Sequence, residues 1–417
     1  MRVWILNQFE ATPVDVGLRP VRHGLLAEAL LARGHSVKWI SSDFLHLTKR
    51  WRRASSQIDG TRGLELELIH NPAYARNVSI RRWLSHKCYA RNLERWLVDK
   101  EAPDAIVVAY PSVDAAWVCV RWARARGVPV IVDVLDTWPD VLLLGVPRAL
   151  GGLGRRVLWS DYARARTIFR GLRYCAAVSK SYLGFARGLA GKRAGFEGER
   201  VYYLGCDASR LGWTRAASED LRRRGIGEKG KNVTFLGTLG RSYDIRSIVR
   251  AAARVGKTLP EAKFVIAGDG PAGAQLRAEA KSMGVQNVVF TGLLRADVVG
   301  TLLEESGVGL LAYADDAPQS VPTKAGEYLA FGLPVISSLR GEFEEMVRAE
   351  GIGLAYRSGD AESLAGAVSQ LMGDSSMLSS CRERARSVFE RQFRAGVIYP
   401  DYAEWVEGIV RASRGGR

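Results

Sequence analysis

The sequence predicts an α/β protein of two Rossmann-like, doubly wound domains, each with a parallel sheet covered by helices. The chain has 417 residues, which is too long for one comfortable core and suits two domains. Short apolar runs alternate with helical segments in both halves, as βαβ units require. A polar, charged stretch at 206–231 separates the halves and suits a linker and the start of a new domain. We therefore expect domains at 1–207 and 208–395, and a C-terminal helix at 396–417 that crosses back to the first domain.

The first domain opens with a strand at 2–9, a loop at 10–21, a helix and a second strand at 37–40. This βαβ order puts the loop at the carboxyl end of the sheet, where ligands bind. Gly17 lets the backbone approach a ligand closely. Three basic residues near it can meet an anion: Arg19, Arg22 and His23. A simple turn glycine would give the same pattern.

Two basic segments follow in the first domain. One is a long helix at 79–100 that includes Arg81 and Arg82, and the other is a helical stretch at 141–173 that mixes leucine, valine and tryptophan with arginine. Basic amphipathic helices are typical of membrane-surface elements. Helices packed on the sheet with a solvated basic face would look the same. Strands are expected around them, with an edge strand at 64–69 and others at 105–109, 128–134, 175–178 and 201–204.

The second domain repeats the architecture without repeating the sequence. Strands are expected at 233–236, 263–267, 288–290, 308–312, 335–336 and 354–355, with closing helices at 360–371 and 376–393. A final helix at 397–412 carries an aromatic packing face that includes Tyr399 and Tyr402. This order predicts a second doubly wound sheet.

The net charge of +16 is concentrated in the first half of the chain. Residues 1–200 hold 32 Lys and Arg against 18 Asp and Glu, whereas residues 201–417 hold 28 against 26. A basic half favours a polyanion or an anionic membrane surface, although an arginine-rich composition would also raise the charge. Five scattered cysteines without a C-x-x-C pair indicate reduced thiols. With no long apolar run and no signal-like start, we expect a cytoplasmic protein.

Several kinds of site are disfavoured by the motifs. The loop Gly237–Arg241 follows a strand and opens a helix, so it can hold a phosphate, but it lacks the lysine-serine ending of a P-loop. Neither this loop nor Gly268–Pro271 has the G-x-G-x-x-G spacing of a nicotinamide site. We find no H-E-x-x-H, Asp-x-Asp or G-x-S-x-G pattern, so neither a metal nor a hydrolase serine is indicated. The basic half contains no recognisable module that reads nucleic acid.

The stretch 319–336 predicts a polar loop, a helix of about ten residues and a buried strand. Pro322 suits the first helical turn, and Gly332 suits the stop. Lys324 and Glu327 stand three residues apart on this helix, so both can face one cavity. A cation for phosphates and a carboxylate for ribose hydroxyls suit a nucleotide diphosphate. A surface helix with an ordinary ion pair is the alternative.

Together these motifs resemble the GT-B glycosyltransferases, two Rossmann-like domains facing across a cleft. The likeness is greatest to the retaining group 1, or family 4-like, enzymes that make bacterial cell-surface polysaccharides. The segment 33–37 is similar to that family's R-G-H-x-V, and 136–140 to its D-x-W-P-[DE]. Val178-Ser179-Lys180 resembles V-S-x, and Phe290-Thr291-Gly292 resembles F-x-G. The segment 322–336 resembles P-[ST]-K-x-x-E-Y-L-A-x-G-x-P-V-[IV].

The resemblance implies roles for particular residues. Glu327 would hold the ribose, Arg241 and Lys324 would neutralise the departing diphosphate, and Asp136 would orient the acceptor or accept its proton. An aspartate that caps the following helix is equally compatible with Asp136. The implied donor site comprises Gly17, Thr238, Leu239, Gly240, Arg241, Gly292, Leu293, Gln319, Ser320, Val321, Lys324 and Glu327.

Gln319 departs from the family pattern, because a glutamate usually occupies this position and contacts the hydroxyls of the donor sugar. An amide still donates and accepts hydrogen bonds, so the resemblance implies binding with an altered sugar preference.

From the resemblance we expect a metal-independent enzyme without a cofactor. It would move a sugar, with retention, from a nucleotide diphosphate sugar, preferably UDP-linked, to a lipid-linked or cell-surface glycan. Arg19, Arg22, His23, Arg81 and Arg82 would meet the acceptor or an anionic membrane at the inner face of the cell membrane. Two alternatives are a UDP-sugar 2-epimerase of the same fold and a non-catalytic nucleotide-sugar-binding partner, the latter motivated by Gln319. Nucleic acid is not an expected partner.

Overall fold

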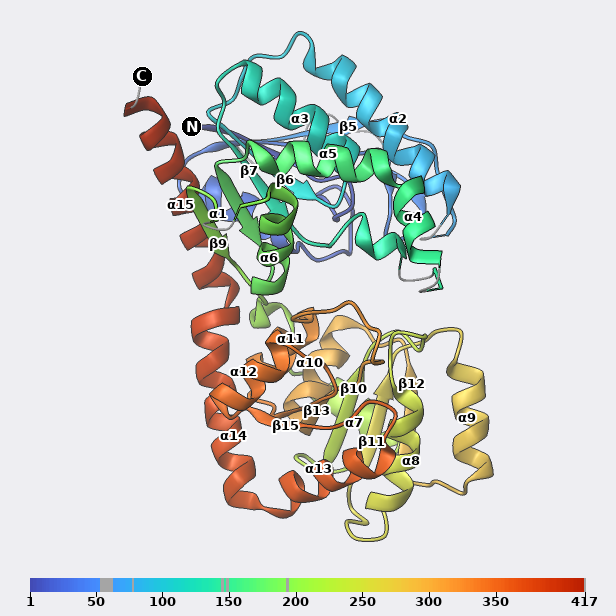
Figure 1. The fold of residues 1–417 in the computed structure, drawn as a ribbon. Coiled ribbons are helices and arrows are strands. Elements are labelled where there is room, and N and C mark those ends of the chain that lie inside the picture. Colours follow the sequence, from blue (N-terminus) through green and yellow to red (C-terminus); the bar gives the residue numbers. More distant parts are fainter. Residues whose placement is uncertain (53–62, 77–78, 144–145, 148–149, 193–194, 416–417) are drawn as a thin grey trace. The chain divides into compact units, whose positions relative to one another are not determined.

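The computed structural model of the chain describes residues 1–52, 63–76, 79–143, 146–147, 150–192 and 195–415. It divides into two compact units, one formed by Met1–Tyr203 with Ile398–Arg417 and the other by Leu204–Val397. Each unit contains one parallel sheet with helices on both faces (Figure 1). The predicted fold class of two α/β domains is thus confirmed. The divisions fall a few residues from the predicted boundaries at 207 and 395.

The sheet of the first unit has seven parallel strands in the order β5-β2-β1-β6-β7-β8-β9. The order in which successive strands are added to the sheet reverses between β1 and β6. The loops after these two strands therefore flank the switch point where α/β sheets bind ligands. β5 lies at the edge, as its alternating pattern predicted. The strands are β1 (Arg2–Leu6), β2 (Ser36–Ser42), β5 (Leu64–Ile69), β6 (Ala105–Tyr110), β7 (Val130–Val134), β8 (Tyr174–Ala177) and β9 (Gly198–Val201), and a small hairpin joins β3 (Phe44–Leu45) to β4 (Arg50–Trp51).

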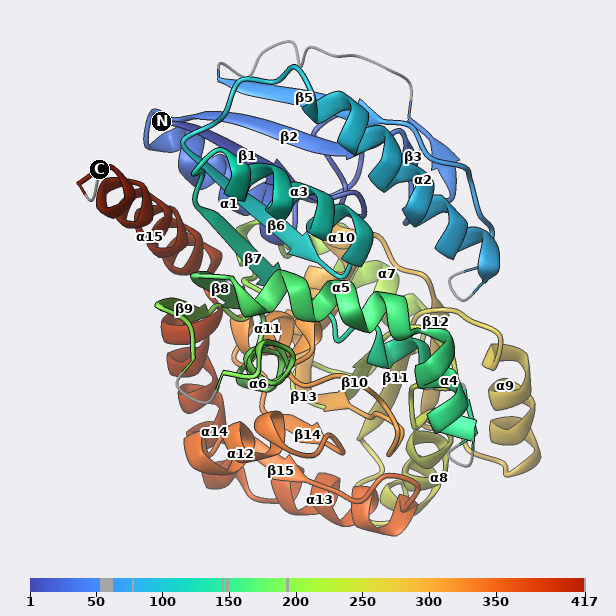
Figure 2. The same cartoon turned by 45° about the horizontal axis from the view of Figure 1, so that its top comes forward.

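Helices cover both faces of this sheet, and α2, α3 and α5 lie along one face in Figure 2. Their apolar sides pack on strand residues such as Leu6, Ile106 and Val132 in one core. A serine caps the start of α2, where the Ser79 hydroxyl accepts a hydrogen bond from the Arg82 backbone N–H. The helices are α1 (Arg22–Ala32), α2 (Ile80–Leu97), α3 (Val113–Ala125), α4 (Gly151–Val157), α5 (Trp159–Arg170), α6 (Lys180–Ala190) and α15 (Ala395–Gly415).

The stretch 141–173 differs from the expectation of continuous helical structure. A 3₁₀ turn at Asp140–Leu143 is followed by the short α4, and Leu158 separates α4 from α5. Three of the seven residues of α4 are glycines, which are poor helix formers. The break at Leu158 lets α5 follow a direction of its own along the sheet.

The sheet of the second unit has six parallel strands in the order β12-β11-β10-β13-β14-β15. Its switch point lies between β10 and β13. The strands are β10 (Asn232–Leu236), β11 (Lys263–Ala267), β12 (Val288–Gly292), β13 (Ser306–Leu311), β14 (Val335–Ser337) and β15 (Gly353–Ala355), and the helices are α7 (Arg215–Arg223), α8 (Ile245–Val255), α9 (Gly273–Ser282), α10 (Ala296–Glu305), α11 (Thr323–Ala330), α12 (Glu342–Glu350), α13 (Ala361–Gly373) and α14 (Ser375–Val388).

The stretch 206–231, interpreted as a linker and the start of the second domain, contains the helix α7, which the sequence pattern did not predict. Thr214 caps α7, since its hydroxyl accepts a hydrogen bond from the Ala217 backbone N–H. Leu221 is fully buried, and α7 packs against α10. The segment is polar because one face of α7 is solvated, which a count of charged residues does not separate from a linker.

The C-terminal helix α15 returns to the first unit through aromatic and ionic contacts. The ring of Tyr402 stacks on Tyr202, with 4.5 Å between the centroids, and both rings are buried. Farther along the helix the Glu407 carboxylate accepts two hydrogen bonds from Arg33, at 2.6 and 2.8 Å, and lies 2.7 Å from His35 Nε2. The hydrogen bonds from Arg33, followed by the one from His35, lower the pKa of Glu407 to about 2.

We predict that Glu407→Gln lowers the Tm at pH 7 by roughly 3–12 °C. Hydrogen bonds to charged groups contribute about 1.5–3 kcal/mol, and a domain of this size shifts by roughly 2–4 °C per kcal/mol. Because the folded-state pKa lies below the ordinary 4.5, the contribution of Glu407 is full above about pH 4.5 and declines as the pH falls toward 2. Thermal unfolding from pH 7 to 3 should show the two curves converging. Glu404→Gln on the exposed side of α15 is the control, and a pH-independent difference would contradict the assignment.

Candidate active site

Three glycine-containing loops meet at the carboxyl edge of the second sheet. The Gly237 N–H donates to the Ala267 carbonyl at 2.9 Å, and the Gly268 N–H donates to the Gly292 carbonyl at 2.9 Å. A Cβ atom added to Gly268 would lie 1.8 Å from the Gly237 oxygen, and one on Gly270 would lie 2.6 Å from the Leu239 oxygen. Side chains at these positions would drive the loops apart, so only glycine permits this backbone contact.

Lys324 points from α11 toward the first of these loops. Its Nζ donates to the Tyr243 hydroxyl at 2.9 Å and lies 4.6 Å from the centroid of that ring. A Cβ atom on Gly237 would lie 2.9 Å from the same Nζ. The structure therefore brings Lys324 together with the Gly237–Arg241 loop. Both lie at the switch point between β10 and β13. A cation beside a glycine loop can receive a phosphate group.

Tyr243 and Tyr328 are two site residues that the sequence interpretation missed. Tyr243 packs between Phe235 and Tyr313, with ring centroids 5.5 and 4.9 Å away, and so supports Lys324. The buried Tyr328 hydroxyl accepts from the Leu236 N–H at 2.9 Å and thereby fixes α11 to the end of β10. The only sign of these residues in the sequence was that each is an aromatic residue beside a polar motif. An aromatic residue at such a position also suits an ordinary core position.

The loop that leads into α11 carries a buried polar atom without a partner. Gln319 Oε1 is inaccessible to solvent and has no hydrogen-bond partner in the part of the chain that the structure describes. The next residue, Ser320, donates to the Glu342 carboxylate at 2.9 Å. Glu327 is half-buried on α11, one turn beyond Lys324. The helix spans eight residues, Thr323–Ala330, and is shorter than the predicted ten. Gly332 follows it in the left-handed conformation, with φ of 63°, at the predicted stop.

The other predicted donor residues have different surroundings. Leu239 is buried in the core, and its backbone N–H and carbonyl bond to Asp269 and Ala272, so the structure differs from the prediction that it contacts the donor. Val321 is also buried, which leaves only its backbone for such a role. Exposed or half-buried positions at the same edge are Thr238, Gly240, Arg241, Gly292 and Leu293. Gly17 belongs to the first unit, where it has φ of 82° and open space around it.

In the first unit, Asp136 follows β7 at the carboxyl edge of the sheet. Its carboxylate accepts from the Thr137 N–H at 2.8 Å and from the Trp138 side chain. Burial raises the pKa of Asp136, partly opposed by these bonds and by the charge of Arg82. A carboxylate of raised pKa is a stronger base, which suits the predicted acceptance of a proton. The described hydrogen bonds to Asp136 come from Thr137 and Trp138. They do not come from the N–H groups of the 3₁₀ turn at Asp140–Leu143, as helix capping would require.

Arg22 and His23 lie in the interior, where they cannot meet a membrane or an acceptor directly as predicted. Arg22 is 1% exposed and donates two hydrogen bonds to Asp133, at 2.6 and 2.8 Å. His23 bonds to Glu10 at 2.8 Å; burial lowers its pKa, but Glu10 and Asp133 together raise it to about 9. A buried charge requires such a partner, and sequence alone did not reveal it. Arg19 and Arg81 are exposed, and Arg82 is half-buried.

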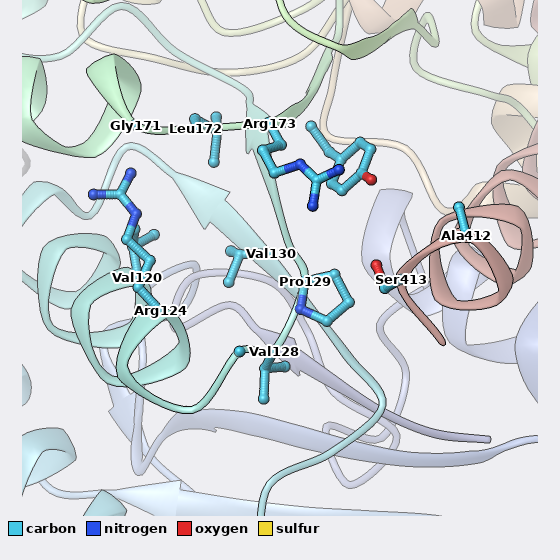
Figure 3. A pocket seen from close by; sticks show the side chains of 12 residues that line it. Val120, Arg124, Val128, Pro129, Val130, Gly171, Leu172, Arg173, Ala412 and Ser413 are labelled. Carbon is cyan, nitrogen blue, oxygen red and sulfur yellow. The ribbon is translucent and has the colours of Figure 1, made fainter. Parts of the chain in front are cut away.

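A separate pocket of about 440 Å³ lies at the amino ends of β7 and β8, on the opposite edge of the first sheet (Figure 3). Arg124 and Arg173 line it, but Arg124 donates to the carbonyls of Thr167 and Ile168, and Arg173 pairs with Glu197 at 2.6 Å. Both guanidinium groups thus have structural roles. The pocket contains none of the predicted site residues.

Among the described residues, no group of three or more His, Cys, Asp or Glu is arranged to hold a metal ion. Within the same residues, no helix is both long and apolar enough to cross a bilayer.

Comparison with known families identifies both halves of the chain. Residues 217–388 match the family described as glycosyl transferases group 1, and residues 21–194 match a glycosyl transferase 4-like domain. The second unit thus carries a domain of the group 1 glycosyl transferases, and the first unit carries a glycosyl transferase 4-like domain. The matched ranges include Arg241 and Lys324 in the second unit and Asp136 in the first.

Relatives and solved structures resemble this chain to different extents. N-acetyl-α-D-glucosaminyl L-malate synthase of Bacillus anthracis is 26% identical over 223 residues, which are 53% of this chain and 54% of the relative. WcaL of Escherichia coli (strain K12), a glycosyltransferase named for colanic acid biosynthesis, is 30% identical over 35% of this chain and 37% of the relative. The chain thus spans about half or less of the length of these relatives.

Two solved structures have the same fold along nearly the whole chain. Sucrose-phosphate synthase of Thermosynechococcus elongatus is similar with a TM-score of 0.74 and 16% identity, covering 99% of both chains. HepE of Anabaena, solved in complex with UDP and glucose, has a TM-score of 0.66 and 16% identity over 98% of this chain and 100% of its own. These likenesses support the GT-B fold of this chain.

We predict that Gly268→Ala destabilises the second unit by about 3 kcal/mol or more, because the new Cβ would collide with the Gly237 carbonyl and the residue has φ of 142°. Chemical denaturation would measure the loss. Gly366→Ala, on α13 with no atom within 4 Å of the added Cβ, is the matched control and should change stability little. Equal stability of both variants would mean that the loops are farther apart than described.

Proposed function

We propose that this protein is a glycosyltransferase that moves a sugar, with retention, from a UDP-linked donor to a lipid-linked or cell-surface glycan at the inner face of the membrane. The observation that carries the donor part is Lys324, held by Tyr243 against the glycine loop at the switch point of the second sheet. HepE, a protein of the same fold, was solved with UDP and glucose, which supports a nucleotide sugar as the donor.

The chemistry follows from the charge that the leaving group gains. Breaking the bond between the anomeric carbon and the diphosphate leaves negative charge on the diphosphate, and a cation already in position stabilises it more in the transition state than in the ground state. Lys324 on α11 is such a cation. The exposed Arg241, at the end of the Gly237–Arg241 loop, is a second. Glu327 would accept hydrogen bonds from the ribose hydroxyls. No metal or cofactor has a part in the proposed reaction.

Gln319 would contact the donor sugar. Its buried Oε1 has no hydrogen-bond partner among the described residues, and an unpaired buried acceptor is costly, so a hydroxyl that donates to it would be recognised specifically. An amide also donates, which a glutamate in its place could not do when ionised. The choice of sugar would therefore depend on this residue.

The acceptor part of the proposal draws on Asp136 and on the surface around it. Asp136, with its raised pKa, would take the proton from the attacking hydroxyl. WcaL, named for colanic acid biosynthesis, supports a cell-surface glycan as the product. A lipid-linked acceptor, as proposed, would require the enzyme to work at a membrane.

Exposed apolar side chains beside arginines supply a surface for that membrane. Trp83, in the first turns of α2, hydrogen-bonds to Asp161 in α5, so the start of α2 lies against the segment that follows α4. Large apolar residues are exposed on these segments, namely Ile80, Trp83, Leu84, Leu150, Leu153, Val157 and Trp159. Exposed Arg81, Arg155 and Arg156 stand among them. Apolar residues flanked by cations match an anionic bilayer interface.

We predict that Lys324→Ala lowers kcat for sugar transfer by about 10²–10³, the loss typical of one group that stabilises transition-state charge. Glu327→Ala should chiefly raise KM for the donor, since it would remove a contact to the ribose. Purified protein, a panel of UDP-sugars and bacterial lipid extract would provide the assay. Lys281→Ala, an exposed lysine at the end of α9, is the matched control. Unchanged transfer in both site variants would disprove the assignment, and UDP-sugar turnover without an acceptor would favour the epimerase.

We predict that the protein sediments with vesicles rich in phosphatidylglycerol at low salt, and not with phosphatidylcholine vesicles. Leu153→Ser combined with Val157→Ser should reduce the bound fraction severalfold, since each removes exposed apolar area from α4. Val98→Ser combined with Met283→Ser changes two exposed apolar residues elsewhere and is the matched control. Loss of binding in both pairs, or binding to neither vesicle, would contradict the membrane surface.

A further inference from the structure

A cation–aromatic cluster occupies the carboxyl edge of the first sheet, beside Asp136. The guanidinium of Arg82 lies over three rings, with centroid distances of 5.0 Å to Trp138, 5.6 Å to Phe9 and 5.9 Å to Tyr74. These rings come from the loops after β7, β1 and β5. Arg82 also donates to His86 Nε2 at 3.4 Å. We call Arg82 and the three rings the Arg82 platform.

A second cation adjoins the platform. Lys49 Nζ lies 4.8 Å from the Tyr74 centroid and 3.0 Å from His46 Nδ1. Burial and the nearby cations Arg82 and Lys49 lower the pKa of His46 to about 4, and burial with Arg82 lowers that of His86 to about 3, so both imidazoles are neutral at pH 7. Two cations therefore act in a partly buried, aromatic environment, and the charge of Asp136 also acts on Arg82.

That setting suits an anion. Burial lowers the pKa of Arg82 and, together with Arg82, that of Lys49, which means that the environment disfavours the two charges. An oxyanion would relieve this cost and would interact strongly where water is partly excluded. The rings restrain the guanidinium plane, so little conformational entropy is lost when two of its N–H groups bond to one anion.

Two buried polar atoms at the same edge support a ligand. Gln8 Oε1 and Ser112 Oγ belong to side chains that are 4% exposed, and neither atom has a hydrogen-bond partner among the described residues. Gln8 follows β1 and Ser112 follows β6, the adjacent strands that flank the switch point of this sheet. Unpaired buried polar groups are rare and require an explanation such as a bound molecule.

We propose that the Arg82 platform, with Lys49, binds an oxyanion of the acceptor and so positions its hydroxyl near Asp136. This inference rests on the proposed glycosyl transfer and names the class of acceptor, one that bears a phosphate or a sugar carboxylate. It assigns Arg82 to acceptor recognition, where the sequence left acceptor and membrane as alternatives. Gln8 and Ser112 would serve the hydroxyl groups beside the anion.

The test uses the full chain with Arg241→Ala and Lys324→Ala, which remove the proposed diphosphate contacts of the second unit. Isothermal titration calorimetry would then measure the binding of inorganic pyrophosphate, methyl glucuronide and uncharged methyl glucoside to this variant. We expect one of the two anions to bind and the glucoside not to bind. Pyrophosphate alone would identify a phosphate-bearing acceptor, and the glucuronide alone a carboxylate sugar. Binding of neither anion would overturn the proposal.

Substitutions then locate the site. Arg82→Gln should weaken anion binding at least about tenfold, which is 1.4 kcal/mol, and Arg82→Lys should weaken it less. Lys49→Gln is a second test that leaves the platform intact. Arg91→Gln, exposed on the same helix α2, removes the same charge and should leave the affinity within about twofold. Equal weakening by Arg82→Gln and Arg91→Gln would show nonspecific attraction and overturn the proposal.

The outcome is separable from that of the proposed function. UDP binding to the unsubstituted chain tests the donor site and should not change in Arg82→Gln. If UDP fails to bind while the anion still requires Arg82, the anion site stands and the transfer proposal fails. In a transfer assay, Arg82→Gln should raise KM for the acceptor and leave KM for the UDP-sugar unchanged, a split that general loss of structure would not produce.

Discussion

Backbone contact between glycine loops controls the arrangement of the second unit. Gly268 and Gly270 let the loop after β11 lie directly against the loop after β10, at distances that no side chain would allow. This contact determines where the Gly237 loop ends and therefore where Tyr243 lies. Tyr243 in turn holds Lys324. The position of the cation thus depends on the absence of side chains from the neighbouring loop.

The first unit depends on a buried ion pair in a comparable way. Arg22 at the start of α1 bonds to Asp133 in β7 and to the Tyr202 carbonyl after β9, while its guanidinium lies 5.6 Å from the Tyr402 ring of α15. Four distant segments therefore meet at one side chain. Buried pairs add little net stability over an apolar core, but removal of one partner is costly. The ion pair therefore contributes more to the specific arrangement of these segments than to the net stability of the unit.

Local patterns predicted much of the fold because they act over a few residues. Strand positions, the left-handed stop at Gly332 and the aromatic face of the C-terminal helix all follow from the period of apolar residues or from a single special residue. The errors have local causes too. Polar composition concealed α7, whose solvated face is charged, and an apolar–basic pattern joined α4 to α5 across Leu158. The motif 322–336 placed Lys324 correctly beside the glycine loop but did not indicate Tyr243.

By itself the sequence determined the two α/β domains, the resemblance to a family and the segments of the proposed donor site, because these follow from short-range periodicity and from motifs of fixed spacing. Only the tertiary structure decided which charges are buried. Arg22, His23 and Arg82 are all basic residues of one half, yet Arg22 pairs with an aspartate 111 residues away, and Arg82 lies on rings from three loops. Such partners are set by strand order and register, which bring together residues that no local pattern connects.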